Sequence, residues 1–223
     1  MTFFETIGKI IERYSSFFAQ GVVNTLIIAA FSVLLGTILG TLMATMRMGK
    51  ILPLKWLAVA YIEFIRGTPL MVQLMFIFYG LPMIGVTFPS VSFIPDFDRF
   101  AAGIVAMSLN SCAYVAEIIR SGIQAVDKGQ MEAGRSLGLS YGVTMKKIIL
   151  PQAVKNILPA LGNEFIALIK ETSVDLTRAA RSIVSKTYDP LVPYLVLALM
   201  YLVLVLIATV LVHQLERVLH KSD

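Results

Sequence analysis

The feature that most constrains this chain is a long uncharged run near its start. Residues 21–46 contain no charged side chain over 26 positions, whereas about 20 apolar residues suffice for a helix to cross a bilayer core. Hydrophobic residues make up 57% of the 223 and charged residues only 15%, against about 25% in soluble domains. The sequence therefore predicts an all-α, polytopic membrane protein.

Further apolar stretches bring the expected number of transmembrane helices to about five, all in a single domain over residues 1–223. The second stretch runs from about Trp56 to Ile84 and contains Arg66-Gly67-Thr68-Pro69. Because a proline lacks the amide donor and disfavours helical geometry at the residue before it, this sequence predicts a kink or break. The remaining spans are expected at about 99–119, 157–174 and 194–212.

The basic residues indicate how these spans are oriented. Arg47, Lys50 and Lys55 directly follow the first span, which places that end in the cytoplasm by the positive-inside rule. The N-terminus is then outside and the C-terminus inside, with eleven Lys and Arg residues predicted inside and six outside. Apolar positions from Phe3 to Phe18 recur at helical spacing, which predicts a helix on the outer membrane surface. A polar segment at 175–193 is also expected outside.

The positions of the basic residues favour contact with lipid and argue against a nucleic-acid-binding surface. The basic residues cluster beside apolar spans and are not interleaved with aromatic side chains, as a nucleic-acid-binding surface would require. The lone cysteine, Cys112, excludes an intramolecular disulfide. His213 and His220 are too sparse for a metal site, so no metal is expected.

A polar, helix-patterned stretch separates the third and fourth spans, at about residues 120–156. Glu132 to Leu137 favours a helix, and Gly138 then permits a left-handed turn. Tyr141 to Ile149 predicts a second short helix that stops ahead of Pro151. Two short helices around a glycine form a compact knob that fits a groove on a partner. The alternative is an amphipathic helix lying on the lipid headgroups.

Motifs in this loop and beyond it resemble a known family. The loop has the spacing of an EAA-type coupling motif at Glu132, Ala133, Gly138, Leu150 and Pro151. Three further segments read IEFIRGTPLMVQ from Ile62, SLNSCAYVAEIIRSGIQ from Ser108 and PQAVKNILPALGNEFIALIKET from Pro151. Together these stretches resemble polar amino acid permeases of the type I ABC importer class.

The resemblance implies a membrane-spanning transport subunit in a prokaryotic inner or plasma membrane. Its partners would be a dimer of ATP-binding cassette ATPases, a second permease subunit, identical or related, and an extracytoplasmic solute-binding protein that delivers a polar amino acid. ATP and Mg²⁺ are expected on the ATPase and no cofactor on this chain, which lacks a GxxxxGK[ST] phosphate loop. No catalytic residues are expected, because the chain is a transport subunit and not an enzyme.

Two carboxylates in the fourth span are the first candidates for substrate binding. Glu164 and Glu171 are seven residues apart, which places both on one helix face. A carboxylate at membrane depth costs about 2.5–3.5 kcal/mol or more, so it usually faces a cavity or a partner. Lining the substrate path, the pair would suit a basic or neutral amino acid. The alternative is that Lys170 or Arg66 neutralises one of them structurally.

A polar stripe on the third span gives further candidates. Asn110, Tyr114 and Glu117 recur at helical spacing, with Ser111 adjacent. The resemblance implies that Asn110, Ser111 and Tyr114 lie near the translocation path. The alternative is that the stripe hydrogen-bonds neighbouring helices.

The break in the second span contributes Arg66 and Thr68 as candidates. Broken helices expose backbone groups that meet ionic substrates, and Arg66 suits a substrate carboxylate. A cytoplasmic, snorkelling role for Arg66 is the alternative. Gly36 and Gly40 form a G-x-x-x-G pattern that permits close helix contact, for which plain packing is a sufficient explanation.

One departure from the family pattern lies between Val174 and Asp175, where about eight residues of a short apolar segment are missing. This departure leaves the outer end of the fourth span and the outer gate undefined. The functional alternative to an ABC permease is an ion-coupled secondary transporter or channel that uses Glu164 and Glu171. A membrane-embedded enzyme would need paired catalytic groups or metal ligands, which the sequence does not offer.

Overall fold

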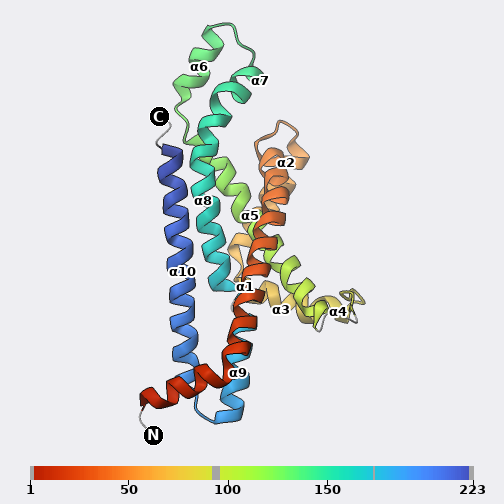
Figure 1. Ribbon diagram of the computed structural model, residues 1–223. Helices are drawn as coiled ribbons and strands as arrows, with labels where there is room; N and C mark the ends of the chain where they lie inside the picture. Colours follow the sequence, from red (N-terminus) through yellow and green to blue (C-terminus); the bar gives the residue numbers. More distant parts are fainter. Residues whose placement is uncertain (1–2, 92–95, 173, 221–223) are drawn as a thin grey trace.

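A single helix of 46 residues, α1 (Phe3–Met48), opens the chain and contains the whole uncharged run. The computed structural model describes residues 3–91, 96–172 and 174–220. These residues form a bundle of helices (Figure 1). The predicted all-α fold is confirmed. The other elements are α2 (Leu52–Gly67), α3 (Leu70–Met75), the π-helical turn η1 (Phe76–Gly80), α4 (Leu81–Met83), α5 (Phe97–Gln124), α6 (Lys128–Ser136), α7 (Tyr141–Thr144), the π-helical turn η2 (Met145–Ile149), α8 (Leu150–Glu171), α9 (Val174–Thr187) and α10 (Leu191–His220).

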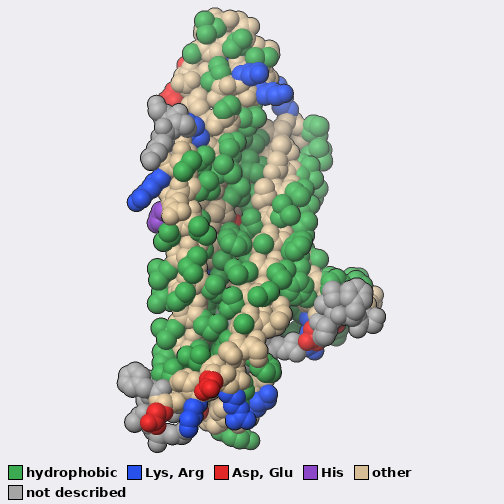
Figure 2. Space-filling view, in the orientation of Figure 1, with side chains coloured by type: hydrophobic (Ala, Val, Ile, Leu, Met, Phe, Trp, Pro, Cys, Tyr) green, Lys and Arg blue, Asp and Glu red, His purple; other side chains and the backbone are tan. Residues whose placement is uncertain are grey.

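Three helices in the described part of the chain are long and apolar enough to cross a membrane, namely Ile7–Met48, Phe97–Gln124 and Leu191–Leu219. The bent pair α2 and α3–α4 would add a fourth span. Helix α8 packs between α5 and α10 but carries four charged side chains. Hydrophobic side chains cover the middle of the face shown in Figure 2, and Lys and Arg gather toward its two ends. The count of five spans stays a prediction.

The two ends of the chain lie at opposite ends of the bundle. Figure 1 shows the N-terminus at one end, and the C-terminus at the other together with α6 and α7. The segment α6–α7–η2 (residues 128–149), here called the knob, projects beyond the bundle at the end that carries the C-terminus. The N-out, C-in orientation stays a prediction, because an orientation needs a membrane as reference.

The second apolar stretch is broken where the sequence predicts a kink or break. Helix α2 and the helical segment Leu70–Met83, which begins with α3, are bent by 104° relative to each other. Between them Thr68 is extended, with φ −117° and ψ 142°, and Pro69 follows with ψ 135°. This is the backbone geometry that a residue before proline prefers.

Two other prolines leave the helices around them continuous. The helix predicted to stop ahead of Pro151 instead runs through it into α8, so that prediction is wrong. The turn η2 ends two residues before Pro151, and the amide of Leu150 donates to the carbonyl of Met145 in the wider π register. Turn η1 ends two residues before Pro82 in the same way. In both places the wider turn makes room for a ring that an ordinary α-turn would crowd.

Close contact between α1 and α5 organises the bundle. A Cβ built on Gly36 would lie 2.8 Å from the Cβ of Ser111, and one on Gly40 would lie 2.8 Å from the Cβ of Val115. These distances leave no room for any side chain at either glycine. The G-x-x-x-G pattern therefore serves helix packing, as its plain interpretation proposes.

The first turns of α1 pack against other helices on one face and are exposed on the other. Their helical periodicity is confirmed, and Ile10, Tyr14 and Phe18 are buried against α9 and α10. The polar segment predicted at 175–193 is largely helical, as α9. The apparent deletion between Val174 and Asp175 falls where the side chains of both residues, and Ser173 before them, lie outside the described part of the chain.

Candidate functional site

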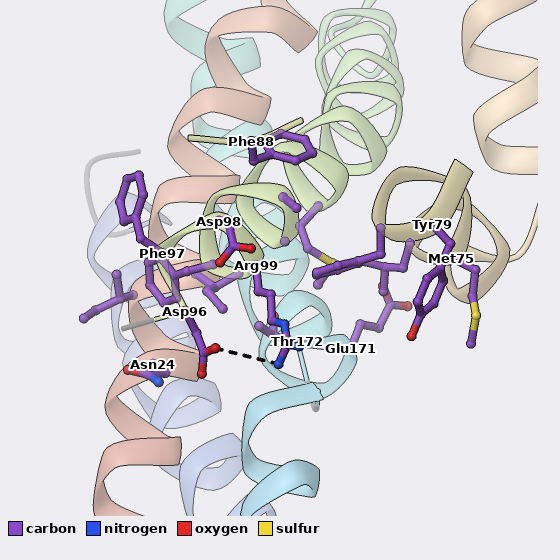
Figure 3. Close-up of a pocket in the computed structure, with 18 of the residues that line it drawn as sticks. Asn24, Met75, Tyr79, Phe88, Asp96, Phe97, Asp98, Arg99, Glu171 and Thr172 are labelled. Carbon is purple, nitrogen blue, oxygen red and sulfur yellow. Dashed lines mark ion pairs between the residues drawn. The ribbon is translucent and has the colours of Figure 1, made fainter. Parts of the chain in front are cut away.

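A cavity of about 1310 Å³ opens among α1, α3, η1, the first turns of α5 and the end of α8. Figure 3 shows Asn24, Tyr79, Asp98 and Glu171 on its walls. Its lining is mostly apolar, with acidic and basic side chains together around the start of α5. Of the residues predicted to bind substrate, Glu171 alone lines this cavity.

The two predicted carboxylates follow one another along α8. Glu171 lies at the cavity, and Glu164 lies two turns nearer the knob, about 10 Å along the helix axis. Glu164 is half-buried, and the buried Ser111 hydroxyl faces its carboxyl. That hydroxyl forms no hydrogen bond of standard geometry within the described residues. Among ion pairs that join described residues, none includes either carboxylate.

Neither cation proposed to neutralise these carboxylates forms an ion pair with them. Lys170 is exposed and lies in electrostatic range of Glu171, without an ion pair between them. Arg66 lies at the other face of α5 and contacts Glu117. Glu164 is half-buried and Glu171 exposed, and neither forms an ion pair among the described residues. Arg99 and Arg181 line the same cavity as Glu171.

Gln73 ties the break between α2 and α3 to α5. Its amide nitrogen donates to the carbonyl of Ile65 at 2.8 Å and to the hydroxyl of Thr68 at 2.8 Å. Its carbonyl oxygen accepts from the side-chain amide of Asn110 at 2.9 Å. Asn110 and Thr68 thus belong to one hydrogen-bonded network that holds the break in place. Sequence reasoning assigned Gln73 no role, although it is a polar residue four positions after Pro69 in an apolar stretch.

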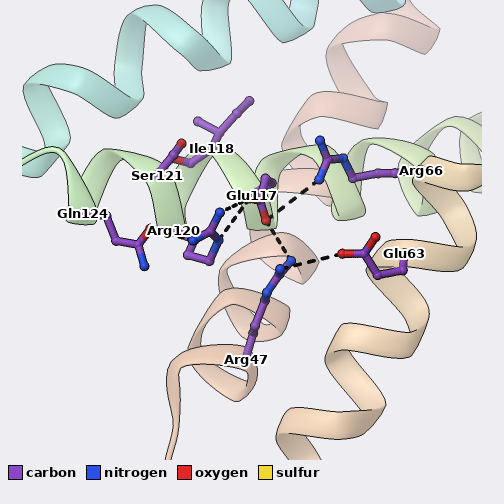
Figure 4. Close-up of polar contacts among 8 residues, drawn as sticks. All are labelled: Arg47, Glu63, Arg66, Glu117, Ile118, Arg120, Ser121 and Gln124. Atoms are coloured by element: carbon purple, nitrogen blue, oxygen red, sulfur yellow. Dashed lines mark hydrogen bonds and ion pairs between the residues drawn. The ribbon is translucent and has the colours of Figure 1, made fainter.

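A charged cluster joins α1, α2 and α5 at the end of the break nearer the knob (Figure 4). The Glu117 carboxylate accepts from Arg47 at 2.7 Å and from Arg120, and Arg66 lies 4.0 Å away. The Arg66 guanidinium also lies over the Tyr114 ring, 5.6 Å from its centroid. Except for Ser111, the polar stripe of α5 is therefore occupied by neighbouring helices, as its structural interpretation proposes.

The knob has the compact turn that its glycine predicts. Gly138 has φ +80°, so the expected left-handed conformation is confirmed. Its amide donates to the carbonyl of Arg135 at 3.0 Å and that of Leu139 donates to the carbonyl of Gly134 at 3.1 Å, which is a Schellman motif. A Cβ on Gly134 would lie 2.5 Å from the Thr144 side chain, so α6 and the end of α7 touch directly.

The surface formed by the knob and the first two residues of α8 is both polar and apolar. All five predicted coupling residues are exposed: Glu132, Ala133, Gly138, Leu150 and Pro151. Beside them, Leu137 is 81% exposed and Tyr141 is 61% exposed. Two large apolar side chains held out into water on a rigid turn are typical of a contact surface for another protein. Leu137 and Tyr141 had no role in the sequence-based prediction.

Known proteins resemble this chain over nearly all of its length. Residues 36–221 match the family described as binding-protein-dependent transport system inner membrane component. The arginine transport system permease protein ArtQ of Bacillus subtilis (strain 168) is 42% identical over 214 residues, which cover 93% of this chain and 94% of ArtQ. The probable glutamine ABC transporter permease protein GlnM of the same strain is 39% identical over 214 residues, 93% of this chain and 95% of GlnM.

Solved structures agree with these relatives. A chain from the crystal structure of an amino acid ABC transporter with histidines has a TM-score of 0.86 and 45% identity, covering 93% of this chain and 96% of that one. A chain of the inward-facing MetNI methionine ABC transporter has a TM-score of 0.71 at 18% identity, which shows the shared fold. None of these similarities supports an ion-coupled transporter or channel. The chain belongs to the family of binding-protein-dependent transport system inner membrane components, as a multi-pass ABC importer permease of the prokaryotic cell membrane and not an enzyme.

Proposed function

We propose that this permease carries polar amino acids with a positively charged group past Glu171 and Glu164. The observation that carries the proposal is the pair of carboxylates on one face of α8, neither of which forms an ion pair among the described residues. A carboxylate in this setting gains most from a ligand that brings an ammonium or guanidinium group. The relatives named for arginine and glutamine transport support a basic or neutral amino acid.

We assign the proposed substrate residues two different roles, contact with the substrate and positioning of the broken helix. Glu171 lines the cavity and Glu164 lies deeper beside Ser111, so these three groups are proposed to contact the substrate. Asn110 and Thr68 are proposed to position the broken helix through Gln73. Tyr114 and Arg66 are proposed to support the same break from its other side through their ring contact.

The knob, together with the first two residues of α8, is proposed as the docking element for a partner ATPase, through Glu132, Ala133, Gly138, Leu150 and Pro151. A dimer of ATP-binding cassette subunits would hold ATP and Mg²⁺, and a second permease subunit, identical or related, would complete the membrane part. An extracytoplasmic solute-binding protein would deliver the amino acid to the cavity end of the bundle. Exposed Leu137 and Tyr141 beside the Schellman turn support a protein contact at the knob.

The test is ATP hydrolysis by the complex in lipid, with its ATPase, with and without the binding protein and a panel of amino acids. Stimulation by one amino acid is expected for the wild-type chain. Glu132→Arg should abolish that stimulation or prevent assembly. If no ATPase associates, or if Glu132→Arg behaves as wild type, the coupling role of the knob is wrong.

The carboxylates need a separate test, which is amino acid uptake into proteoliposomes. Glu164→Gln keeps the size of the side chain and removes its charge, so uptake of a basic amino acid is expected to fall by tenfold or more while the complex still assembles. Asn163→Ser changes the exposed neighbour on the same helix and serves as the control. Unchanged uptake in Glu164→Gln would remove this residue from the substrate path.

A further inference from the structure

A second, smaller cavity lies at the knob end of the bundle and plays no part in the proposed transport path. Its volume is about 470 Å³. We call it the basic pocket, and it is lined by Arg47, Met48, Lys55, Val59, Arg120 and Gln124. These residues come from the end of α1, the first half of α2 and the end of α5. A volume above 300 Å³ is in the range of sites for small organic ligands.

The groups in and around the basic pocket carry more positive than negative charge. Arg47 and Arg120 share the Glu117 carboxylate, and Arg47 also lies 3.7 Å from Glu63. Lys55 has no carboxylate partner among the described ion pairs. With Arg66 counted as well, four cations face two carboxylates, an excess of two positive charges. An anion entering the pocket therefore meets an attractive field that the protein itself leaves uncompensated.

The residues beside the pocket are of the kinds that are common where a bilayer meets water. Trp56 follows Lys55 directly and is 70% exposed, and tryptophan is enriched where the bilayer meets water. Exposed apolar side chains surround it on the first turns of α2, at Ile51, Leu52, Leu54 and Leu57. Met48 and Val59 add apolar lining beside the cations. A ligand with a charged head and an apolar tail fits this arrangement.

We propose that the basic pocket binds a phosphate group, and that an anionic phospholipid headgroup supplies it. The guanidinium groups of Arg47 and Arg120 are held in place by Glu117, so they present their remaining N–H groups to a phosphate without further ordering. The exposed Lys55 ammonium closes over the phosphate from the α2 side. Basic pockets between helices on the cytoplasmic side of a membrane bind anionic headgroups through these contacts.

The test uses the full-length chain purified in a neutral detergent and stripped of lipid. Phosphatidylglycerol, phosphatidylcholine or inorganic phosphate is added back, with native mass spectrometry to count retained lipid and thermal unfolding to report binding. One phosphatidylglycerol per chain is expected to survive in the mass spectrometer, with a raised melting temperature. Lys55→Gln should weaken that binding roughly fivefold, the effect of one basic group near an anionic lipid.

Lys50→Gln is the matched control, because Lys50 is an exposed lysine in the bend between α1 and α2, five residues before Lys55, and does not line the pocket. Equal weakening by both variants, or equal retention of phosphatidylcholine and phosphatidylglycerol, would overturn the proposal. Stabilisation by phosphatidylglycerol alone identifies lipid as the source of the phosphate, whereas displacement of the lipid by inorganic phosphate identifies a free anion. Lys55 is in none of the ion pairs that described residues form with Glu117, so Lys55→Gln is expected to leave the fold intact. Arg47→Gln would instead break an ion pair that joins α1 to α5.

Discussion

Glycine residues decide where the helices of this permease approach most closely. Gly36 and Gly40 bring α1 against α5, and Gly122 and Gly162 bring α8 against α5 and α10. In lipid, where association gains little from hydrophobic burial, such close approach supplies the packing energy between helices. Substituting one of these glycines therefore tests the packing of a whole pair of helices.

We expect Gly40→Ala to destabilise the permease by about 1–3 kcal/mol, the usual cost of overpacking. The new methyl group would lie 2.8 Å from the Val115 side chain and 2.9 Å from the backbone carbonyl of Cys112, which cannot move aside. Thermal unfolding in detergent measures the loss. Gly103→Ala is the control, because no heavy atom lies within 4 Å of its added Cβ and alanine favours the helix. Equal melting temperatures for the two variants would contradict the close α1–α5 contact.

A second prediction at the residue scale concerns Gln73. Gln73→Met keeps the length of the side chain but leaves Asn110 and Thr68 without their shared partner. We expect a loss of about 1–3 kcal/mol in stability and slower uptake, because the break between α2 and α3 is then less well fixed. Gln152→Met is the control, since the amide of the exposed Gln152 donates to the carbonyl of Ile148, one turn earlier in the same continuous helical segment. Uptake equal to wild type would show that this network does not position the break.

These residues also show which local features a sequence discloses. The positive φ of Gly138 was predictable, because the need for glycine arises within one turn of the chain. The role of Gln73 was not, because its partner Asn110 lies 37 positions away and nothing local requires it. Likewise, the placement of Glu164 and Glu171 on one helix face follows from helix geometry. Which charged side chains lie near them depends on how segments distant in the sequence pack against α8.

At the scale of elements, the prolines differ in their effect. Pro69 separates α2 from α3, whereas Pro82 and Pro151 are accommodated by the π-helical turns before them. All three lack the same amide hydrogen. Whether the helix stops or widens depends on what holds the following residues, which for Pro151 is the packing of α8 against α5 and α10. Sequence alone therefore predicted a break at Pro69 and, wrongly, an end at Pro151.

The turn between α6 and α7 gives the prediction for this scale. Gly138→Val places a β-branched side chain at φ +80°, at a cost of about 1–2 kcal/mol. We expect faster amide hydrogen exchange across α6 and α7 and, if the knob docks the ATPase, less of it purified with the permease. Gly142→Ala in the same knob is the control, because its Cβ would meet no atom within 4 Å. Unchanged exchange in Gly138→Val would show that the turn does not fix the knob.

At the scale of the whole molecule, orientation in the membrane is open to direct measurement. In a background of Cys112→Ala, single cysteines at the exposed positions Ser16, Ser136 and Gln214 report three parts of the bundle. We expect a membrane-impermeant maleimide to label Ser16→Cys in cells whose cell wall or outer membrane has been made permeable. Ser136→Cys and Gln214→Cys should be labelled only after the inner membrane is also permeabilised. Labelling of Ser16→Cys and Ser136→Cys from one side would contradict the predicted topology.

The length of one helical segment has a mechanical consequence. From Tyr141 to Glu171 the backbone is helical without a loop, because η2 joins α7 to α8. At 1.5 Å per residue this segment is a rod about 45 Å long. A push on its knob end is therefore passed along the helix toward both carboxylates. Pro159, which interrupts one backbone hydrogen bond, is the point at which the rod bends most easily, and it lies between the knob and Glu164.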